Sequence, residues 1–296
     1  MEVSLQVAKA PAAGEAAKPE DVLITCAFTM VSLDPATKKP VAIAPLLVET
    51  PEERLLFQKG EENYRAKKAL RTRSLLEKAP NERESDLIHS MWTKGMSYSN
   101  PESPAQRPPN TIAMASSVLK SAMIMQPQDR NRHNFMIFGG FLLKETFELA
   151  FCCAASFSHS RPNFISLDPS TFENSVPVGS VLYLRATVAF TEPYSEGGSD
   201  GGSGSGGSGS TSYTKVRVRV DTQVRDVEHG TKKPAGMFNY TFLVEGDVQV
   251  MPQTYGEFMV WTDARRRSEN AAAMAAAAGG VKEPSALRGL KDSVTE

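Results

Sequence analysis

The chain has few of the residues that build metal centres or disulfide frameworks. Its 296 residues include four histidines and three cysteines. The histidines are scattered, and Cys152 and Cys153 have no second cysteine pair, so the spacing of a metal site is absent from the sequence. Neighbouring cysteines on a helix point apart and Cys26 has no evident partner, which argues against a disulfide framework and indicates a reducing compartment.

The sequence also lacks an excess of one charge and a long hydrophobic run. A formal net charge of −1 gives no indication of a nucleic-acid partner. The apolar run at residues 141–157 carries three charged residues and is shorter than the ~20 residues that span a membrane. Residues 1–7 alternate as a strand does, so we expect no secretory signal or transit peptide there.

What the chain does have is a polar loop that leads directly into an apolar helix. Residues 131–138 read Asn-Arg-His-Asn-Phe-Met-Ile-Phe, glycines follow at 139 and 140, and the run 141–157 has only a narrow polar stripe. So narrow a polar face predicts an enclosed helix. The first helical turn has unpaired N–H groups and a partial positive charge, so it would polarise a docked carbonyl oxygen, and glycines allow close approach to the backbone.

A strand that ends in a carboxylate follows the helix. Arg161-Pro162 stops the helix, residues 163–167 are strand-like, and Asp168 precedes a turn at Pro169-Ser170. Two roles stay open for Asp168. It either initiates the turn, as aspartate often does, or presents its carboxylate to the enclosed helix as a general base.

Two parts of the chain repeat one pattern. Apolar residues alternate in residues 3–7 as they do in residues 216–220, and a longer strand follows each, at 22–31 and 237–244. Only the second copy is preceded by a helix and further strands. Residues 1–50 are therefore either the last hairpin of an incomplete first domain or an orphan hairpin that packs on the second domain. We expect the former, because an isolated hairpin is marginally stable.

The remaining segments complete the predicted organisation. Residues 108–257 are expected to form the complete domain, of the α+β class. Residues 51–107 are charged and predict a partly helical linker. Residues 197–210 are nearly pure Gly and Ser and indicate a flexible hairpin insertion. We expect residues 258–296 to be an Ala-rich, weakly ordered tail, which from residue 271 onward is either loosely ordered or a solitary helix.

Several of these segments together resemble one family, the hotdog-fold acyl-CoA thioesterases, and in particular the double-hotdog branch of the acyl-coenzyme A thioesterase 9 type. The resemblance runs over about residues 21–257. The residues that carry it are Asp129-Arg130-Asn131, Ile137 to Leu142, Phe147 to Ala150, Phe164 to Asp168 and Val178 to Ser180, supported by Pro45-Leu46, Glu49 to Glu53, and Pro252 to Glu257.

The resemblance implies both a fold and a reaction. The fold is an antiparallel sheet wrapped around a long central helix, as one complete copy plus a C-terminal remnant of a preceding copy. The reaction is hydrolysis of acyl-CoA to free fatty acid and coenzyme A, which is part of the substrate, so no cofactor or metal is expected. No Gly-x-Ser-x-Gly nucleophile motif is present, which favours direct attack by water.

The resemblance also assigns candidate site residues. Asp168 would be the base that activates water, and Asn131 or Asn134 would orient the water or the carbonyl, because the loop is one residue longer than the family pattern. The expected substrate-binding residues are His133, Phe138, Gly139 and Gly140.

The family pattern further implies an assembly and a location. The loop Asn and the acidic residue of one hotdog site usually come from different hotdog units, so we expect a homo-oligomer formed through hotdog pairing. Relatives are often mitochondrial, and a cytoplasmic location is the alternative expectation.

Two other functions stay open at this point. A hydratase of the same fold, acting on an enoyl-CoA, uses an Asp and a His in the loop before the helix, and the stretch from Asp129 to His133 resembles that pattern. A catalytically inactive acyl-CoA-binding fragment is favoured by the incomplete first copy.

Overall fold

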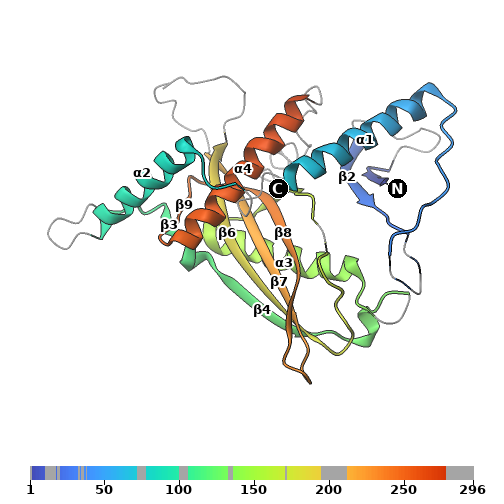
Figure 1. The fold of residues 1–296 in the computed structure, drawn as a ribbon. Helices are drawn as coiled ribbons and strands as arrows, with labels where there is room; N and C mark the ends of the chain where they lie inside the picture. The colour runs from blue at the N-terminus through green and yellow to red at the C-terminus, as the bar shows by residue number, and fades with distance from the viewer. Residues whose placement is uncertain are drawn as a thin grey trace. The chain divides into compact units, whose positions relative to one another are not determined.

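A computed structural model gives the fold of the chain. It describes residues 2–10, 18, 21–32, 34, 37, 39–71, 78–99, 106–132, 136–170, 172–194 and 212–277. The chain divides into two compact units (Figure 1): Met1–Lys78 with Val281–Glu296, and Ala79–Gly280.

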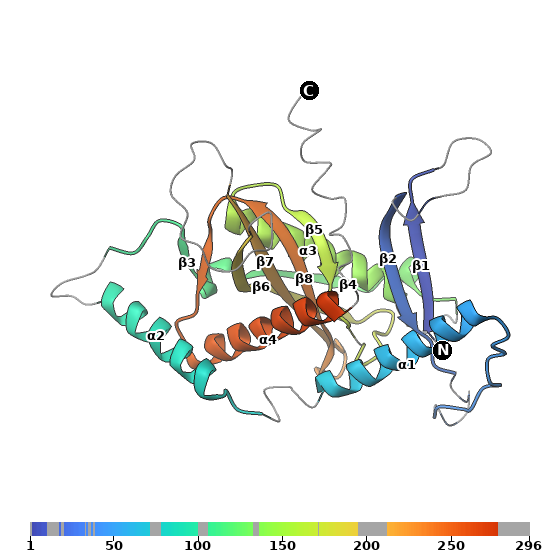
Figure 2. The ribbon, with the colours of Figure 1, turned by 90° about the horizontal axis from the view of Figure 1, so that it is seen from above.

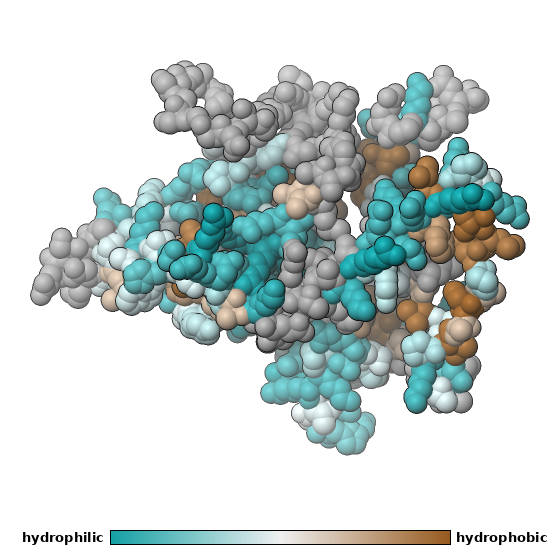
Figure 3. Space-filling view, turned by 45° about the horizontal axis from the view of Figure 1, so that its top comes forward, coloured by the Kyte–Doolittle hydropathy of each residue, from teal (hydrophilic) through white to brown (hydrophobic). Residues whose placement is uncertain are grey.

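The first unit contains a hairpin and a helix. Strands β1 (Glu2–Ala8) and β2 (Val22–Thr29) pair antiparallel, as the alternation in the sequence predicted. Helix α1 (Pro51–Arg71) begins where Thr50 and Glu53 cap each other, with Glu53 N–H donating to Thr50 Oγ1 and Thr50 N–H donating to Glu53 Oε2. This unit exposes many large apolar side chains, including Leu5, Val31, Leu46 and Leu47. Figure 3 shows the hydrophobic surface of the molecule in brown.

The second unit is built on a five-stranded antiparallel sheet. Its order is β4 (Leu119–Ile124), β6 (Val181–Tyr194), β7 (Tyr213–Arg225), β8 (Lys232–Glu245), β5 (Asn163–Leu167). Helix α3 (Gly139–Ser158) packs along one face of this sheet (Figure 2). This confirms the predicted α+β class and the arrangement of a sheet around one long helix.

The inner face of the sheet, which contacts α3, carries the core. Alternate residues of β7 and β8 point to it and are at most 2% exposed, and each such apolar side chain stabilises the fold by about 1.5–3 kcal/mol. Helix α3 is buried where it meets them. The principal residues are Val216, Val218, Val220, Phe238, Tyr240, Phe242, Ala150, Cys153, Ala154 and Phe157.

The outer face of the sheet is partly covered by a helix that the sequence did not predict. Helix α4 (Tyr255–Ala277) lies across it, so the expectation of a weakly ordered tail from residue 258 is wrong as far as residue 277. The physical reason is an apolar stripe at its start: Phe258 and Trp261 are buried, and the Trp261 ring lies 5.3 Å from that of Phe190.

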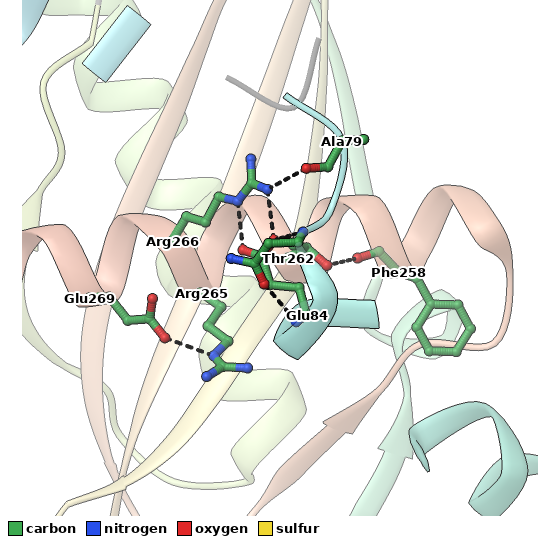
Figure 4. A network of polar contacts seen from close by, with 8 residues as sticks. Ala79, Glu84, Phe258, Thr262, Arg265, Arg266 and Glu269 are labelled. Atoms are coloured by element: carbon green, nitrogen blue, oxygen red, sulfur yellow. Dashed lines mark hydrogen bonds and ion pairs between the residues drawn. The ribbon is translucent and has the colours of Figure 1, made fainter. Parts of the chain in front are cut away.

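Helix α2 (Glu82–Tyr98) also belongs to the second unit, so residues 79–99 are not part of a linker between units. Its N-cap Asn81 and Glu84 form a capping box. Arg266 of α4 binds Glu84 and the Ala79 carbonyl, as Figure 4 shows, which ties α2 to α4. A small parallel pair, β3 (Thr111–Ala113) and β9 (Gln249–Met251), completes this region.

Bulges interrupt the sheet where single residues fall out of register. One lies in β6 between Val188 and Phe190, and it places Phe190 opposite Arg217 on the outer face. Another lies in β5 between Phe164 and Ser166. A bulge reverses the facing of every residue after it in the strand. No helix among the described residues has the length and hydropathy needed to cross a membrane.

Candidate functional site

The polar loop closes at its base immediately before α3. Phe138 N–H donates to the Asp129 carbonyl at 2.8 Å, and Asn131 N–H donates to the Met136 carbonyl at 2.7 Å. The half-buried Asn131 therefore stands at the foot of the loop, beside the start of the helix. Two predicted site residues lie outside the described residues: His133 and Asn134.

The N-cap residue of α3 makes no side-chain capping hydrogen bond. This residue is Phe138, whose ring is 59% exposed and offers no acceptor to the first-turn amides. Gly139 and Gly140 follow as the first two helical residues, and their missing side chains keep this turn open. A Cβ at Gly139 would lie 3.2 Å from Cζ of Phe172, and a Cβ at Gly140 would overlap the ring of Phe138.

The segment after β5 forms one wall of this region. Phe172 pairs with Gly236 in an isolated bridge, and its ring lies 5.6 Å from that of Phe238. The Val176 carbonyl accepts a hydrogen bond from Ile137 N–H at 2.8 Å. Segment 168–176 thus contacts both the loop and the first residue of α3. Sequence reasoning missed Phe172, and its only signal was a lone aromatic residue in a polar turn.

Below the first turn of α3 the interior is aromatic, with one buried hydroxyl pair. Thr146 Oγ1 lies 2.8 Å from Tyr240 Oη and donates to the Leu142 carbonyl. Burial raises the pKa of the Tyr240 hydroxyl, although its hydrogen bond to Thr146 acts in the opposite direction. The Phe147 ring lies 5.4 Å from the Phe164 ring in an edge-on arrangement. These side chains form a closely packed, largely apolar interior along α3.

The narrow polar stripe of α3 forms ion pairs. Lys144 Nζ lies 3.2 Å from Glu145 Oε1 and 3.2 Å from Glu148 Oε1. The hydrogen bond to Glu148, and after it the one to Glu145, raises the pKa of the Lys144 ammonium. Lys144 therefore pairs with both acidic residues of the stripe.

Asp168 points away from α3, which corrects the sequence-based expectation. Phe164, four residues earlier, faces α3, and unbroken alternation would place Asp168 on that same face. The bulge before Ser166 shifts the register, so Ser166 lies opposite Thr241 and Asp168 N–H donates to the Asn239 carbonyl at 2.9 Å. The Asp168 carboxylate consequently lies on the outer face of the sheet.

The outer face holds Asp168 in a buried ion pair. Arg217 Nη1 lies 3.4 Å from Asp168 Oδ1, and the two side chains are 9% and 10% exposed. Burial raises the pKa of the Asp168 carboxyl, against the attraction of Arg217 and of Arg267, while Asp263 adds to the increase. Arg267 and Asp263 belong to α4 and pair with each other at 2.8 Å.

The structure therefore brings together some of the predicted residues and separates one. Asn131, Phe138, Gly139 and Gly140 meet at the N-terminal end of α3. Asp168 does not face them within this chain. Amides at a helix N-terminus beside a polar loop can polarise a carbonyl oxygen. Among the described residues, no group of three or more His, Cys, Asp or Glu side chains could hold a metal ion.

Comparison with known proteins gives the following similarities. No protein-family model matches the chain. Over 257 residues it is 35% identical to mitochondrial acyl-coenzyme A thioesterase 9 of Bos taurus, which covers 85% of this chain and 53% of that protein. The Homo sapiens protein of the same name is 35% identical over 249 residues, which cover 82% of this chain and 51% of that protein. Chloroplastic acyl-coenzyme A thioesterase 2 of Humulus lupulus is 33% identical over a match that covers 86% of this chain and 54% of that protein.

The chain spans about half the length of the curated relatives it matches. Among solved structures, an apo-hexameric acyl-CoA thioesterase is 23% identical, with a TM-score of 0.47, over 56% of this chain and 98% of that chain.

Proposed function

Because the chain belongs to the family of the hotdog-fold acyl-CoA thioesterases, we propose that it hydrolyses acyl-CoA to a free fatty acid and coenzyme A. Water attacks the thioester carbonyl carbon, the C–S bond breaks, and the thiolate leaves and takes up a proton. The observation that carries the proposal is the N-terminus of α3, where Phe138 makes no side-chain capping hydrogen bond and Gly139 and Gly140 follow a polar loop.

The first-turn amides at Gly139 and Gly140 would stabilise the developing oxyanion. Such donors are fixed before the reaction, so they need no reorganisation when charge develops, and one well-placed donor contributes about 2.7–4 kcal/mol to lowering the barrier. Asn131 or Asn134 would orient the attacking water or the carbonyl. The apolar interior beneath the first turn, with Phe147 and Phe164, would accept the acyl chain.

The residue predicted to be the base, Asp168, does not face the α3 helix of its own chain. The role predicted for Asp168 conflicts with its pairing to Arg217 on the outer face, so we propose that a carboxylate of a second hotdog unit completes the site. Strand β5 offers an edge for such pairing, because β8 is its only neighbour among the described strands. Phe147, Phe151 and Phe164 are half-buried near that edge, and a second unit would cover them.

The partner proposed for that edge is a second copy of this chain, and the proposed compartment is the mitochondrion. The second proposal is supported by the names of the relatives, of which the Bos taurus and Homo sapiens proteins are called mitochondrial. Fractionation of cells that express the natural protein tests the location, and recovery in the cytosol alone would contradict it.

The function is tested by thiol release from a series of acyl-CoAs of short to long chain, with the full chain at several protein concentrations. We expect release that depends on chain length and rises more than linearly with protein concentration where copies associate. Binding of acyl-CoA without thiol release at any concentration would contradict the proposal and favour a binding protein. Addition of water across the double bond of an enoyl-CoA, without thiol release, would instead favour a hydratase.

A further inference from the structure

Asp168 and Arg217 connect two strands that are not neighbours. Asp168 follows β5, Arg217 lies in β7, and both strands pair with β8, which runs between them. The carboxylate and the guanidinium therefore meet across the outer surface of β8, with Oδ1 and Nη1 3.4 Å apart. The pair fixes the end of the edge strand β5 to the centre of the sheet.

The pair is buried and incompletely satisfied. Among the described residues, Asp168 Oδ2, Arg217 Nε and the neighbouring Thr241 Oγ1 are buried without a hydrogen-bond partner. Burying charges in this way costs free energy that their mutual attraction rarely repays in full. Such a pair is a poor source of global stability, and its value lies in holding one particular geometry.

The geometry that it holds is that of the candidate site. Asp168 is the first residue of segment 168–176, which carries Phe172 against Gly139 and whose Val176 carbonyl accepts from Ile137 N–H. Glu173 N–H also donates to the Ala235 carbonyl at 2.9 Å, so the segment is attached to β8 as well. A displacement of Asp168 would move the wall that contacts the first turn of α3.

We propose that Asp168 is a positioning residue, which acts through Arg217 and segment 168–176 to hold the N-terminal amides of α3 in place. The effect on catalysis rests on the proposed thioesterase function, whereas the effect on the helix N-terminus does not. The competing assignment, Asp168 as general base, requires its carboxylate to reach the water on the α3 side.

The two assignments differ in what Arg217 does. If Asp168 acts by position, Asp168→Asn keeps an oxygen that accepts from Arg217, and kcat falls by less than about tenfold with the acidic limb of its pH profile unmoved. Arg217→Met leaves the carboxylate unpaired and lowers kcat further, with a smaller change in KM. If Asp168 is the base, Asp168→Asn lowers kcat by about 10²–10⁴ and removes the acidic limb, and Arg217→Met has the smaller effect.

Hydrogen exchange of amides 139–143 supplies a readout that does not need activity. In the full chain, Arg217→Met is expected to accelerate their exchange by about tenfold while amides of β7 and β8 stay protected. Arg225→Met is the matched control, because Arg225 lies on the same strand and face but stacks on Tyr183, 4.1 Å from the ring centroid. It should leave exchange at 139–143 unchanged.

A second variant keeps the test informative where Arg217→Met fails to fold. Asp168→Leu combined with Arg217→Met leaves no unpaired buried charge and is expected to fold, with the same faster exchange at 139–143. Unchanged exchange in a folded variant that lacks the pair would overturn the proposal, and so would the kinetic pattern of a base. Absence of thiol release by the wild-type chain would overturn the thioesterase function alone, because the exchange test still stands.

Discussion

Arg266 donates two hydrogen bonds to the carboxylate of Glu84, from Nε to Oε1 and from Nη2 to Oε2, each 2.7 Å long (Figure 4). Both side chains are largely buried, at 14% and 10% exposure. Glu84 Oε2 also accepts from Asn81 N–H at 2.8 Å, so one carboxylate both caps α2 and fixes its first turn to α4. This relationship joins helices that lie about 180 residues apart in the sequence.

Loss of this pair should destabilise the second unit. Arg266→Ala leaves a buried carboxylate unpaired, and we expect the free energy of unfolding to fall by about 3 kcal/mol. Urea unfolding of the full chain measures it. Glu269→Gln is the control, because Glu269 pairs with Arg265 at an exposed position and its loss should cost less than about 1 kcal/mol. Equal effects of the two substitutions would contradict a special role for Glu84 and Arg266.

The contribution of Glu84 should depend on pH. The hydrogen bond from Arg266 is the largest cause that holds the pKa of Glu84 below its ordinary value. A lowered pKa in the folded state stabilises the protein above the unfolded pKa of about 4.3, and this is lost as pH falls through the folded pKa. The stability difference between wild type and Glu84→Gln is therefore expected to be largest near neutrality and to shrink below about pH 4. A difference that stays constant between pH 7 and pH 3 would rule this out.

Substitution of Gly140 in α3 should lower the activity without lowering the stability of the fold. Alanine at 140 forces the exposed Phe138 ring aside, which is cheap, and favours the helix by up to about 1 kcal/mol. The added methyl group also narrows the approach to the first-turn amides. We expect Gly140→Ala to keep or raise the melting temperature and to lower kcat/KM by at least about tenfold, a loss of about 1.4 kcal/mol in transition-state binding.

The matched control for Gly140→Ala is Gly256→Ala in the first turn of α4, where a Cβ meets nothing within 4 Å. It should leave kcat/KM unchanged. A folded Gly140→Ala variant with wild-type kcat/KM would mean that the substrate carbonyl does not approach this turn.

The cysteines should differ in reactivity. Cys153 is fully buried, its Sγ donates to the Ser117 carbonyl at 3.2 Å, and burial raises the pKa of its thiol to about 12. Cys152 is exposed and Cys26 is partly exposed. Since the thiolate is the reactive form, an aromatic disulfide reagent at pH 8 should titrate two thiols in the native chain and the third only after denaturation. Rapid reaction of all three in the native state would contradict the described packing.

Much of the second unit could be predicted because its elements have strong local patterns. The enclosed helix was expected at residues 141–157 and is observed as Gly139–Ser158, and the strand at 163–167 has the bounds expected. Helix α4 was missed because its buried stripe is confined to its first part, while its alanine-rich end suggested a loose tail. The packing of Phe258 and Trp261 on the sheet is a tertiary feature that no local pattern shows.

The site was only partly predictable for a related reason. The loop, Phe138 and the two glycines are contiguous, so their meeting at one helix end follows from the sequence. The facing of Asp168 depends on whether a residue of β5 before it lacks a partner on β8, and the sequence Phe-Ile-Ser-Leu at 164–167 does not decide this. The pairing of Asp168 with Arg217 could not be inferred without the register of three strands.

The single unpaired residue in β5 decides which face of the sheet each later residue of the strand points to. If the bulge were lost with no residue removed, strict alternation from Phe164 would place Asp168 on the α3 side and shift the residues after it by one position along β8. A residue role can therefore be assigned from one hotdog sequence to another only if the bulges of each strand agree. Identical residues at aligned positions do not show on which face of the sheet a carboxylate lies.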